Sequence, residues 1–282
     1  MNKGVIKVLY FIAILILGLL VFVVFSHIRP MLQGNIDWIG RICLITGLFL
    51  SALIIKKNEN LKNHWMLLFA FGIAATAMAI DLYLPSTSWW LFIFQVSSDT
   101  PLGIAIDKLD SSILIIFSIL ILNKVSGGTL ENLFLLKGNV CKSLKIGIIA
   151  FVICVSGAYF VAQMFGAQNL SLSRVIPWIP FILIFIIGNA LNEEIMFRGL
   201  FLRKMEPFLG RLLTNLVIAI PFVLHHTGVT YTQNALMFLL FLLPLSLAWG
   251  FIAQKTDSIW GSFLFHAGTD IPVIIAIFAV LI

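Results

Sequence analysis

Residues 189–198 place several ionisable side chains inside a long apolar run, reading Asn-Ala-Leu-Asn-Glu-Glu-Ile-Met-Phe-Arg. A charge at the centre of a membrane helix costs about 2.5–3.5 kcal/mol, so such residues call for a reason. Glu194 and Arg198 are four residues apart, which puts them on one helix face in the favourable order for an ion pair. Glu193 points about 100° away and is left free to act as a general base. A purely structural ion pair is the alternative for Glu194 and Arg198.

Two further polar clusters follow within apolar sequence. Phe222-Val-Leu-His225-His226 ends in adjacent histidines, which taken alone are equally compatible with surface residues. In His266-Ala-Gly-Thr-Asp270 the imidazole and the carboxylate lie on one helix face at a spacing of four. Gly261 and Gly268 on the same helix leave room for close approach of a neighbouring helix.

Together the three clusters supply a base, imidazoles, a cation and a polar acceptor on three separate helices, which is the inventory of a buried hydrolytic site. The chemistry predicted is attack by an activated water on a carbonyl group, with negative charge building on oxygen. Whether His225 contributes is left open. The candidate site residues are Glu193, Glu194, Arg198, His226, His266 and Asp270.

The elements that must position these residues are membrane helices. Of the 282 residues, 61% are hydrophobic and 11% charged, whereas a soluble domain averages about 45–50% apolar and about 25% charged. Lipid must therefore surround most of the chain. We predict an all-α polytopic helical bundle with about eight or nine transmembrane helices. The net charge of +6 is attributed to loop lysines that set topology, and no nucleic-acid partner is expected.

Apolar runs of spanning length predict nine segments, and the distribution of positive charge predicts their orientation. With a cytoplasmic N-terminus, thirteen Lys and Arg residues fall in cytoplasmic segments and four in outer ones, with Arg198 inside a span. The outer four are Arg29, Arg41, Lys108 and Arg174. The predicted spans are 5–25, 39–55, 65–84, 104–123, 143–165, 177–202, 211–225, 234–253 and 259–281. The aromatic stretch at 89–92 is expected at the membrane interface.

The chain divides into three parts on this basis. Residues 1–124 are predicted to be membrane-anchor helices forming about four spans, 125–142 a cytoplasmic linker, and 143–282 the core that carries the site. All the unusual polar residues are expected in the second half. The first apolar run is interpreted as a retained span, because it is long for a signal peptide. The three cysteines form no C-x-x-C pair, which argues against a disulfide framework and a thiolate zinc site.

The order Glu-Glu-x-x-x-Arg, Phe-x-x-x-His and His-x-x-x-Asn/Asp on successive spans resembles the CAAX protease and bacteriocin-processing family, also called CPBP or Abi. The resemblance covers about 144–273 and includes the type 2 CAAX prenyl endopeptidases. It implies a protease core over 143–282 and an intramembrane endopeptidase.

The resemblance also implies a role for each candidate residue. Glu193 would activate water and His226 would hold and polarise it. His266 and Asp270 would orient and stabilise the oxyanion, while Glu194 and Arg198 would brace the site. The family often has asparagine where this chain has Asp270. An ionised aspartate cannot donate to an oxyanion, so Asp270 is either protonated or orients His266.

The resemblance to the prenyl endopeptidases implies no cofactor and favours a metal-free glutamate mechanism. Zinc is the alternative, because Glu193, His226, His266 and Asp270 are metal-ligand types and the family is often labelled metalloprotease. No His-Glu-x-x-His sequence occurs.

The expected partners are the lipid bilayer and a peptide or membrane-protein substrate in a cell membrane, with composition hinting at a bacterial plasma membrane. A non-catalytic protein of the bacteriocin-immunity or signalling type is the alternative function. A proton-coupled transporter is a third, for which no inverted repeat is visible.

Overall fold

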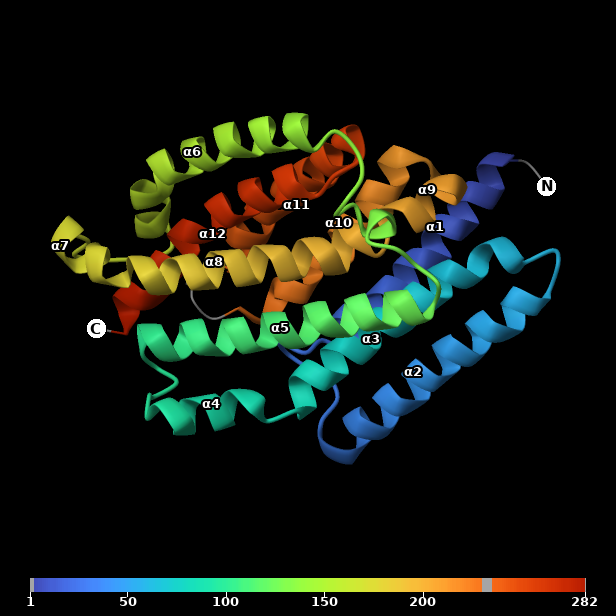
Figure 1. Ribbon diagram of the computed structural model, residues 1–282, viewed down its shortest axis with the longest axis horizontal. Helices are drawn as coiled ribbons and strands as arrows, with labels where there is room; N and C mark the ends of the chain where they lie inside the picture. The colour runs from blue at the N-terminus through green and yellow to red at the C-terminus, as the bar shows by residue number, and fades with distance from the viewer. Residues whose placement is uncertain (1–2, 230–234, 282) are drawn as a thin grey trace.

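The computed structural model describes residues 3–229 and 235–281, and its regular elements in these ranges are all helices (Figure 1). The all-α prediction is thereby confirmed. The first half consists of α1 (Lys3–Leu19, continued by the π-helical turn Leu20–Val24), α2 (Gly34–Lys57), α3 (Trp65–Tyr83), α4 (Ser86–Phe94) and α5 (Pro101–Val125). The second half consists of α6 (Val140–Met164), α7 (Leu172–Val175), α8 (Ile179–Glu193, continued by the π-helical turn Glu194–Gly199), α9 (Leu202–Leu209), α10 (Arg211–His225), α11 (Ala235–Thr256) and α12 (Trp260–Val280).

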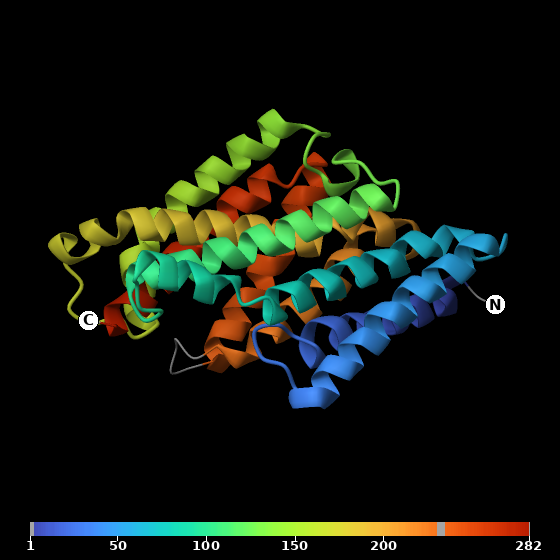
Figure 2. The same ribbon diagram turned by 60° about the horizontal axis from the view of Figure 1, so that its bottom comes forward.

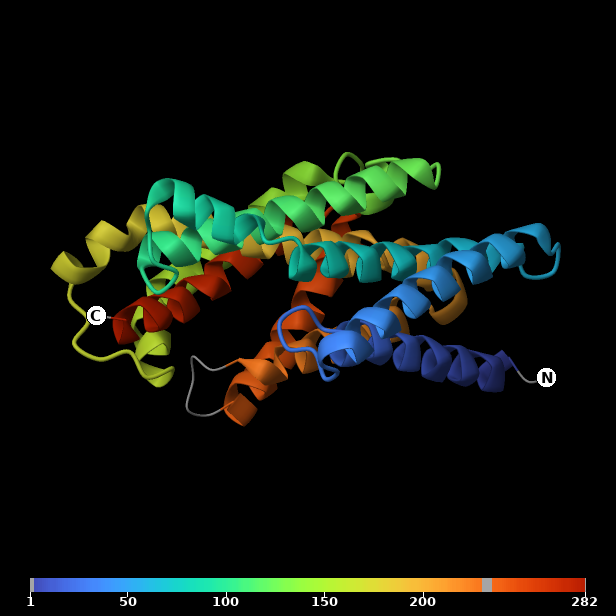
Figure 3. The same cartoon turned by 90° about the horizontal axis from the view of Figure 1, so that it is seen from below.

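Seven helical segments in the described ranges are long and apolar enough to cross a membrane, and each coincides with a predicted span. The two remaining predicted spans, 104–123 and 211–225, are the helices α5 and α10. They differ from the seven because α5 carries Asp107, Lys108 and Asp110, and α10 has only 15 residues. The termini lie at opposite ends of the bundle (Figures 1 and 3), as an odd number of crossings requires.

The short helix α4 lies at the end of the bundle that also holds the C-terminus (Figure 1). Trp89, Trp90 and Phe92 on it are exposed, as expected for aromatic side chains at a membrane interface. Its attachment to α5 is polar. The Trp90 indole donates to Asp110 Oδ1 at 3.0 Å, and Ser86 Oγ donates to Asp110 Oδ2 at 2.6 Å.

Close helix contacts set the position of α12, the helix that carries His266. A Cβ at Gly261 would collide with the backbone oxygen of Ser143 on α6, and one at Gly268 would press on Phe151 and Cys154 of the same helix. The prediction that these glycines allow close approach is confirmed. On the other side of the bundle, α5 runs between α3 and α8 (Figures 1 and 2).

The segment between α5 and α6 packs onto the core at the end that holds the N-terminus. The Trp260 indole donates to the carbonyl of Leu135 at 3.0 Å, and Arg203 Nη1 donates to the carbonyl of Glu131 at 2.8 Å. This segment includes most of the predicted linker 125–142, and its cytoplasmic position remains a prediction.

Candidate active site

The helix that carries the glutamates changes geometry where they occur. Glu193 is the last residue of α8, and Glu194 is the first of the π-helical turn that ends at Gly199. Such a widened turn inside a helix is frequent at functional sites. Glu194 Oε1 lies 3.1 Å from Arg198 Nη1, and both side chains are almost fully buried, at 0% and 1% exposure. The predicted ion pair is confirmed.

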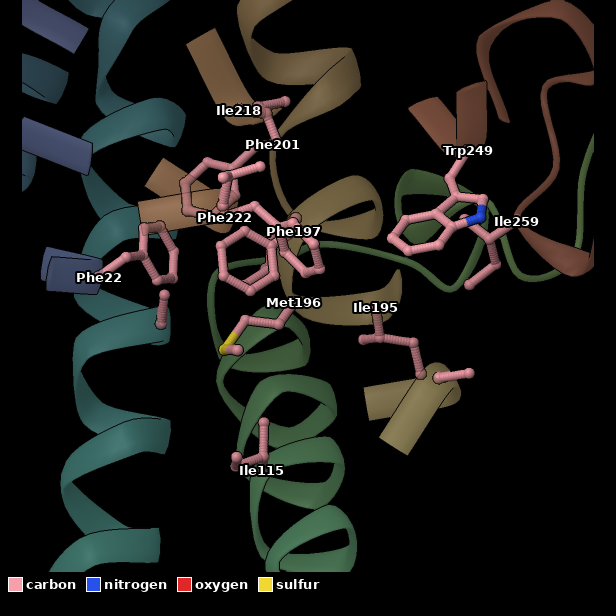
Figure 4. Close-up of a cluster of buried hydrophobic side chains, with 14 of the residues drawn as sticks. Phe22, Ile115, Ile195, Met196, Phe197, Phe201, Ile218, Phe222, Trp249 and Ile259 are labelled. Carbon is pink, nitrogen blue, oxygen red and sulfur yellow. The ribbon is translucent and has the colours of Figure 1, made fainter. Parts of the chain in front are cut away.

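The guanidinium of Arg198 is enclosed by aromatic rings and a serine. Its Cζ lies 4.6 Å from the centre of the Phe222 ring and 5.2 Å from that of Trp249. Nη2 donates to Ser246 Oγ at 2.8 Å and to the Ser246 carbonyl at 3.1 Å. Figure 4 shows Phe222 beside Phe197 in the apolar cluster that underlies this region. The buried cation thus ties the π-helical turn to α10 and α11.

His266 on α12 is oriented by Glu194. Its Nδ1 lies 3.0 Å from Glu194 Oε1, and its ring stacks on Trp249 with centroids 3.8 Å apart and an interplanar angle of 9°. With Nδ1–H donating to Glu194, the ring presents Nε2 to Glu193 Oε2 at 3.4 Å and to Asp270 Oδ1 at 3.7 Å. Glu194 therefore holds His266 in a fixed direction.

His226 approaches Glu193 from the C-terminal end of α10. Its Nδ1–H donates to the carbonyl of Phe222 at 2.9 Å, which leaves Nε2 unprotonated in the neutral ring. Nε2 lies 3.6 Å from Glu193 Oε1. The two carboxylate oxygens of Glu193 thus face two different imidazoles, one on α10 and one on α12.

Asp270 faces the same centre and has an amide partner. Asn189 Nδ2 on α8 donates to Asp270 Oδ2 at 2.9 Å. Two alternatives were predicted for Asp270: it is protonated, or it orients His266. The carboxylate faces His266 Nε2, while the opposite nitrogen of that ring is held by Glu194. Asp270 is therefore not the principal residue that orients His266, and its part in the reaction remains a prediction.

These side chains open onto a cavity of about 660 Å³ within the bundle. Glu193, His226, His266 and Asp270 line it, while Glu194 and Arg198 are not among its lining residues in the described part of the chain. All six predicted residues thus belong to one connected group, four at the cavity surface and two behind it. Most of the remaining wall is apolar, from α6, α11 and α12, and includes Val161, Met164, Phe238, Phe241, Leu242, Leu245 and Val273.

The opposite wall comes from the first half of the chain, so the expectation that unusual polar residues lie only in the second half is too narrow. His27, Asp81, Lys108 and Ser111 all line the cavity. His27 Nε2 lies 3.6 Å from Asp81 Oδ2. Burial holds the pKa of His27 well below its usual value, with a further lowering by nearby His225. Charged residues within the predicted spans 65–84 and 104–123 were the sequence signal for this wall, whereas nothing in the sequence near His27 singles it out.

His225 has a different environment from its neighbour His226. Its Nδ1 lies 2.7 Å from the carbonyl of Phe22 and 3.1 Å from Ser26 Oγ. Arg41 in turn donates to the carbonyls of Phe25 and Ser26 at 2.7 and 2.8 Å. His225 therefore joins α10 to the segment after α1.

Whether the site is metal-free or binds zinc stays a prediction. In the described ranges, no group of three or more His, Cys, Asp or Glu residues is placed to hold a metal ion. The set Glu193, His226, His266 and Asp270 has the right residue types, but the contacts among its members are ion pairs at 3.4–3.7 Å. No chemical step below is therefore assigned to zinc.

Comparison with known proteins gives one match. Residues 175–272 match the family model described as Type II CAAX prenyl endopeptidase Rce1-like. No curated protein and no solved structure matches the chain. The matched segment begins at the last residue of α7 and ends within α12, so it holds all six predicted site residues. It is about a third of the chain and leaves α1 to α6 outside. On this match and its three motifs, the segment 175–272 of this multi-pass membrane protein belongs to the CAAX protease and bacteriocin-processing family.

Proposed function

We propose that the chain is an intramembrane endopeptidase that hydrolyses a peptide bond with a water activated by Glu193. The observation that carries the proposal is the position of the Glu193 carboxylate, 3.6 Å from His226 Nε2 and 3.4 Å from His266 Nε2 at the surface of a cavity. Two hydrogen-bond acceptors, Glu193 Oε1 and His226 Nε2, face each other at a separation that a water lying to one side can bridge. Such a water keeps an oxygen lone pair free for attack.

The proposed reaction has two proton transfers. Glu193 takes a proton from the water as its oxygen bonds to the carbonyl carbon. His266, when protonated, donates a hydrogen bond from Nε2–H to the developing oxyanion, while its Nδ1–H continues to donate to Glu194. Collapse of the tetrahedral intermediate breaks the C–N bond, and Glu193 returns the proton to the leaving amine. Glu194 and Arg198 act as positioning residues because they fix His266 and the π-helical turn.

The proposed substrate is a peptide bond in a membrane-associated peptide or in the tail of a membrane protein. A cavity of about 660 Å³ lies in the range of about 300–1,000 Å³ typical of ligand pockets. It is far too small for a folded domain and suits an extended segment. The proposed location is the plasma membrane of a bacterium, consistent with a composition rich in Ile, Lys, Asn and Phe.

The test is cleavage of a peptide library by purified protein in liposomes, read by mass spectrometry. We expect defined products with the native chain and with Glu59→Gln, a control at an exposed glutamate. We expect no products with Glu193→Gln, which retains shape but cannot accept a proton. Full activity of Glu193→Gln would refute the proposal. We expect a chelator to leave the rate of peptide cleavage unchanged. If the chelator abolishes cleavage and added zinc restores it, the metal-free mechanism is wrong.

A further inference from the structure

The cavity extends from Glu193 toward one end of the bundle only. On α8 its lining residues are Phe185, Asn189 and Glu193, and on α10 they are Phe222 at the C-terminal end and His226 just beyond it. Because α8 and α10 run in opposite directions, the N-terminal part of α8 and the C-terminal end of α10 lie at the same end (Figure 1).

Several lining residues at that end lie outside the long helices, and Ile28 and Thr87 are two of them. Ile28 belongs to the connection between α1 and α2, and Thr87 to the first turn of α4. Ile28 is 42% exposed. The connections at the opposite end are 58–64, 126–139 and 257–259. Within the described part of the chain, none of their residues lines the cavity.

The two ends of the bundle differ in positive charge. Apart from Arg198 inside the bundle, thirteen Lys and Arg residues lie toward the end that holds the N-terminus and four toward the end onto which the cavity opens. Two of those four do not face solution freely. Arg41 is buried, with Nε 2.8 Å from Asp37 Oδ2, and Lys108 lines the cavity. Only Arg29 and Arg174 remain, so the positive-inside rule places the N-terminal end in the cytoplasm.

From these observations we infer that the cavity opens to the non-cytoplasmic face of the membrane, and that its substrates are exported peptides or extracytoplasmic segments of membrane proteins. The second clause rests on the proposed endopeptidase function. Toward the opposite end, Glu194 and Arg198 are packed under Phe222 and Trp249, and no described residue of the connections there lines the cavity. The extended segment enters beside Ile28 and reaches Glu193 between the wall from α5 and the opposite wall from α12.

The native cysteines of α6 provide a matched test of this inference. Cys141 is exposed near the N-terminal end of α6, and Cys154 lines the cavity thirteen residues further along the same helix. Three variants are compared: Cys141 alone, Cys154 alone, and Ile28→Cys in a chain with all three native cysteines replaced by alanine. Each is treated in intact cells with a charged, membrane-impermeant maleimide, before and after permeabilisation.

We expect Ile28→Cys to be modified in intact cells at least tenfold faster than Cys141, and Cys154 to be reached from the same side. Cys141 should react only after permeabilisation. Modification of Cys141 in intact cells, with Ile28→Cys protected, would overturn the inference. Modification of Cys154 only after permeabilisation would overturn it as well.

Labelling needs no catalysis, so the inference and the proposed function fail separately. Repeating the labelling with Glu193→Gln in each variant should give the same pattern. A chain that labels as expected but cleaves no peptide in the liposome assay would refute the endopeptidase proposal while leaving the orientation of the cavity established. A chain that cleaves peptides but is labelled from the cytoplasmic side would support the endopeptidase proposal and refute the inferred orientation of the cavity.

Discussion

Replacing Glu194 by glutamine separates the role of this residue from that of its neighbour. In the native chain, Glu194 Oε1 lies 3.0 Å from His266 Nδ1 and 3.1 Å from Arg198 Nη1. Glutamine keeps an oxygen that can accept a hydrogen bond from His266 but removes the negative charge that faces Arg198. Because Arg198 is only 1% exposed, solvent cannot replace the lost partner. Removing one member of a buried pair costs about 3–5 kcal/mol, since an uncompensated charge is left behind. The free energy of unfolding should fall by this amount.

The assay is unfolding of purified protein in detergent, followed by tryptophan fluorescence, with peptide cleavage measured in parallel. Glu59→Gln is the control, because its pair with Lys62 is exposed and such pairs contribute about 0–1 kcal/mol. The double variant Glu194→Gln with Arg198→Met removes both charges and should recover part of the loss. If Glu194→Gln unfolds like the native chain, the ion pair is not holding the site together. Glu193→Gln, by contrast, should lose cleavage with unfolding little changed.

Three further predictions concern packing, pH and a hydrogen bond. Gly261→Ala should force α12 away from Ser143 and displace His266, with a loss of about 10²-fold in the rate of peptide cleavage for a shift near 1 Å. Stability should decline as pH falls below about 6.5, because the unfolded chain then binds a proton at His27 that the folded chain, with the lowered pKa, does not. Acid unfolding curves of His27→Gln should show a smaller decline, and an identical curve would contradict this assignment. Ser246→Ala should lower the free energy of unfolding by about 1.5–3 kcal/mol, since it removes an acceptor for a buried guanidinium; unchanged unfolding would show that the bond contributes nothing.

Local patterns in the sequence predicted some of these features well. Spacing along one helix was enough for the pair of Glu194 and Arg198, and the apolar runs located the long helices because each must cross the membrane. The approach of Glu193 to His226 and His266 was expected from the combined chemistry of the three clusters and from the family resemblance, since no periodicity relates residues on three helices.

Other features depend on contacts that the sequence does not encode locally. His27 and Asp81 meet although 54 residues separate them, and His225 reaches back to Phe22 on the first helix. These contacts arise because α1, α3 and α10 pack together, which hydropathy alone does not specify. The charges at Asp81, Asp107 and Lys108 were visible within two predicted spans and gave the available signal that the first half contributes to the cavity.

The most direct test of the central claim is a double-mutant cycle on kcat with Glu193→Gln and His226→Asn. If both side chains act on one water, each single variant should lose at least about 10²-fold in kcat, and the double variant should be no slower than the worse single one. Losses that multiply in the double variant would show that the two residues act independently and would contradict the mechanism proposed for this site.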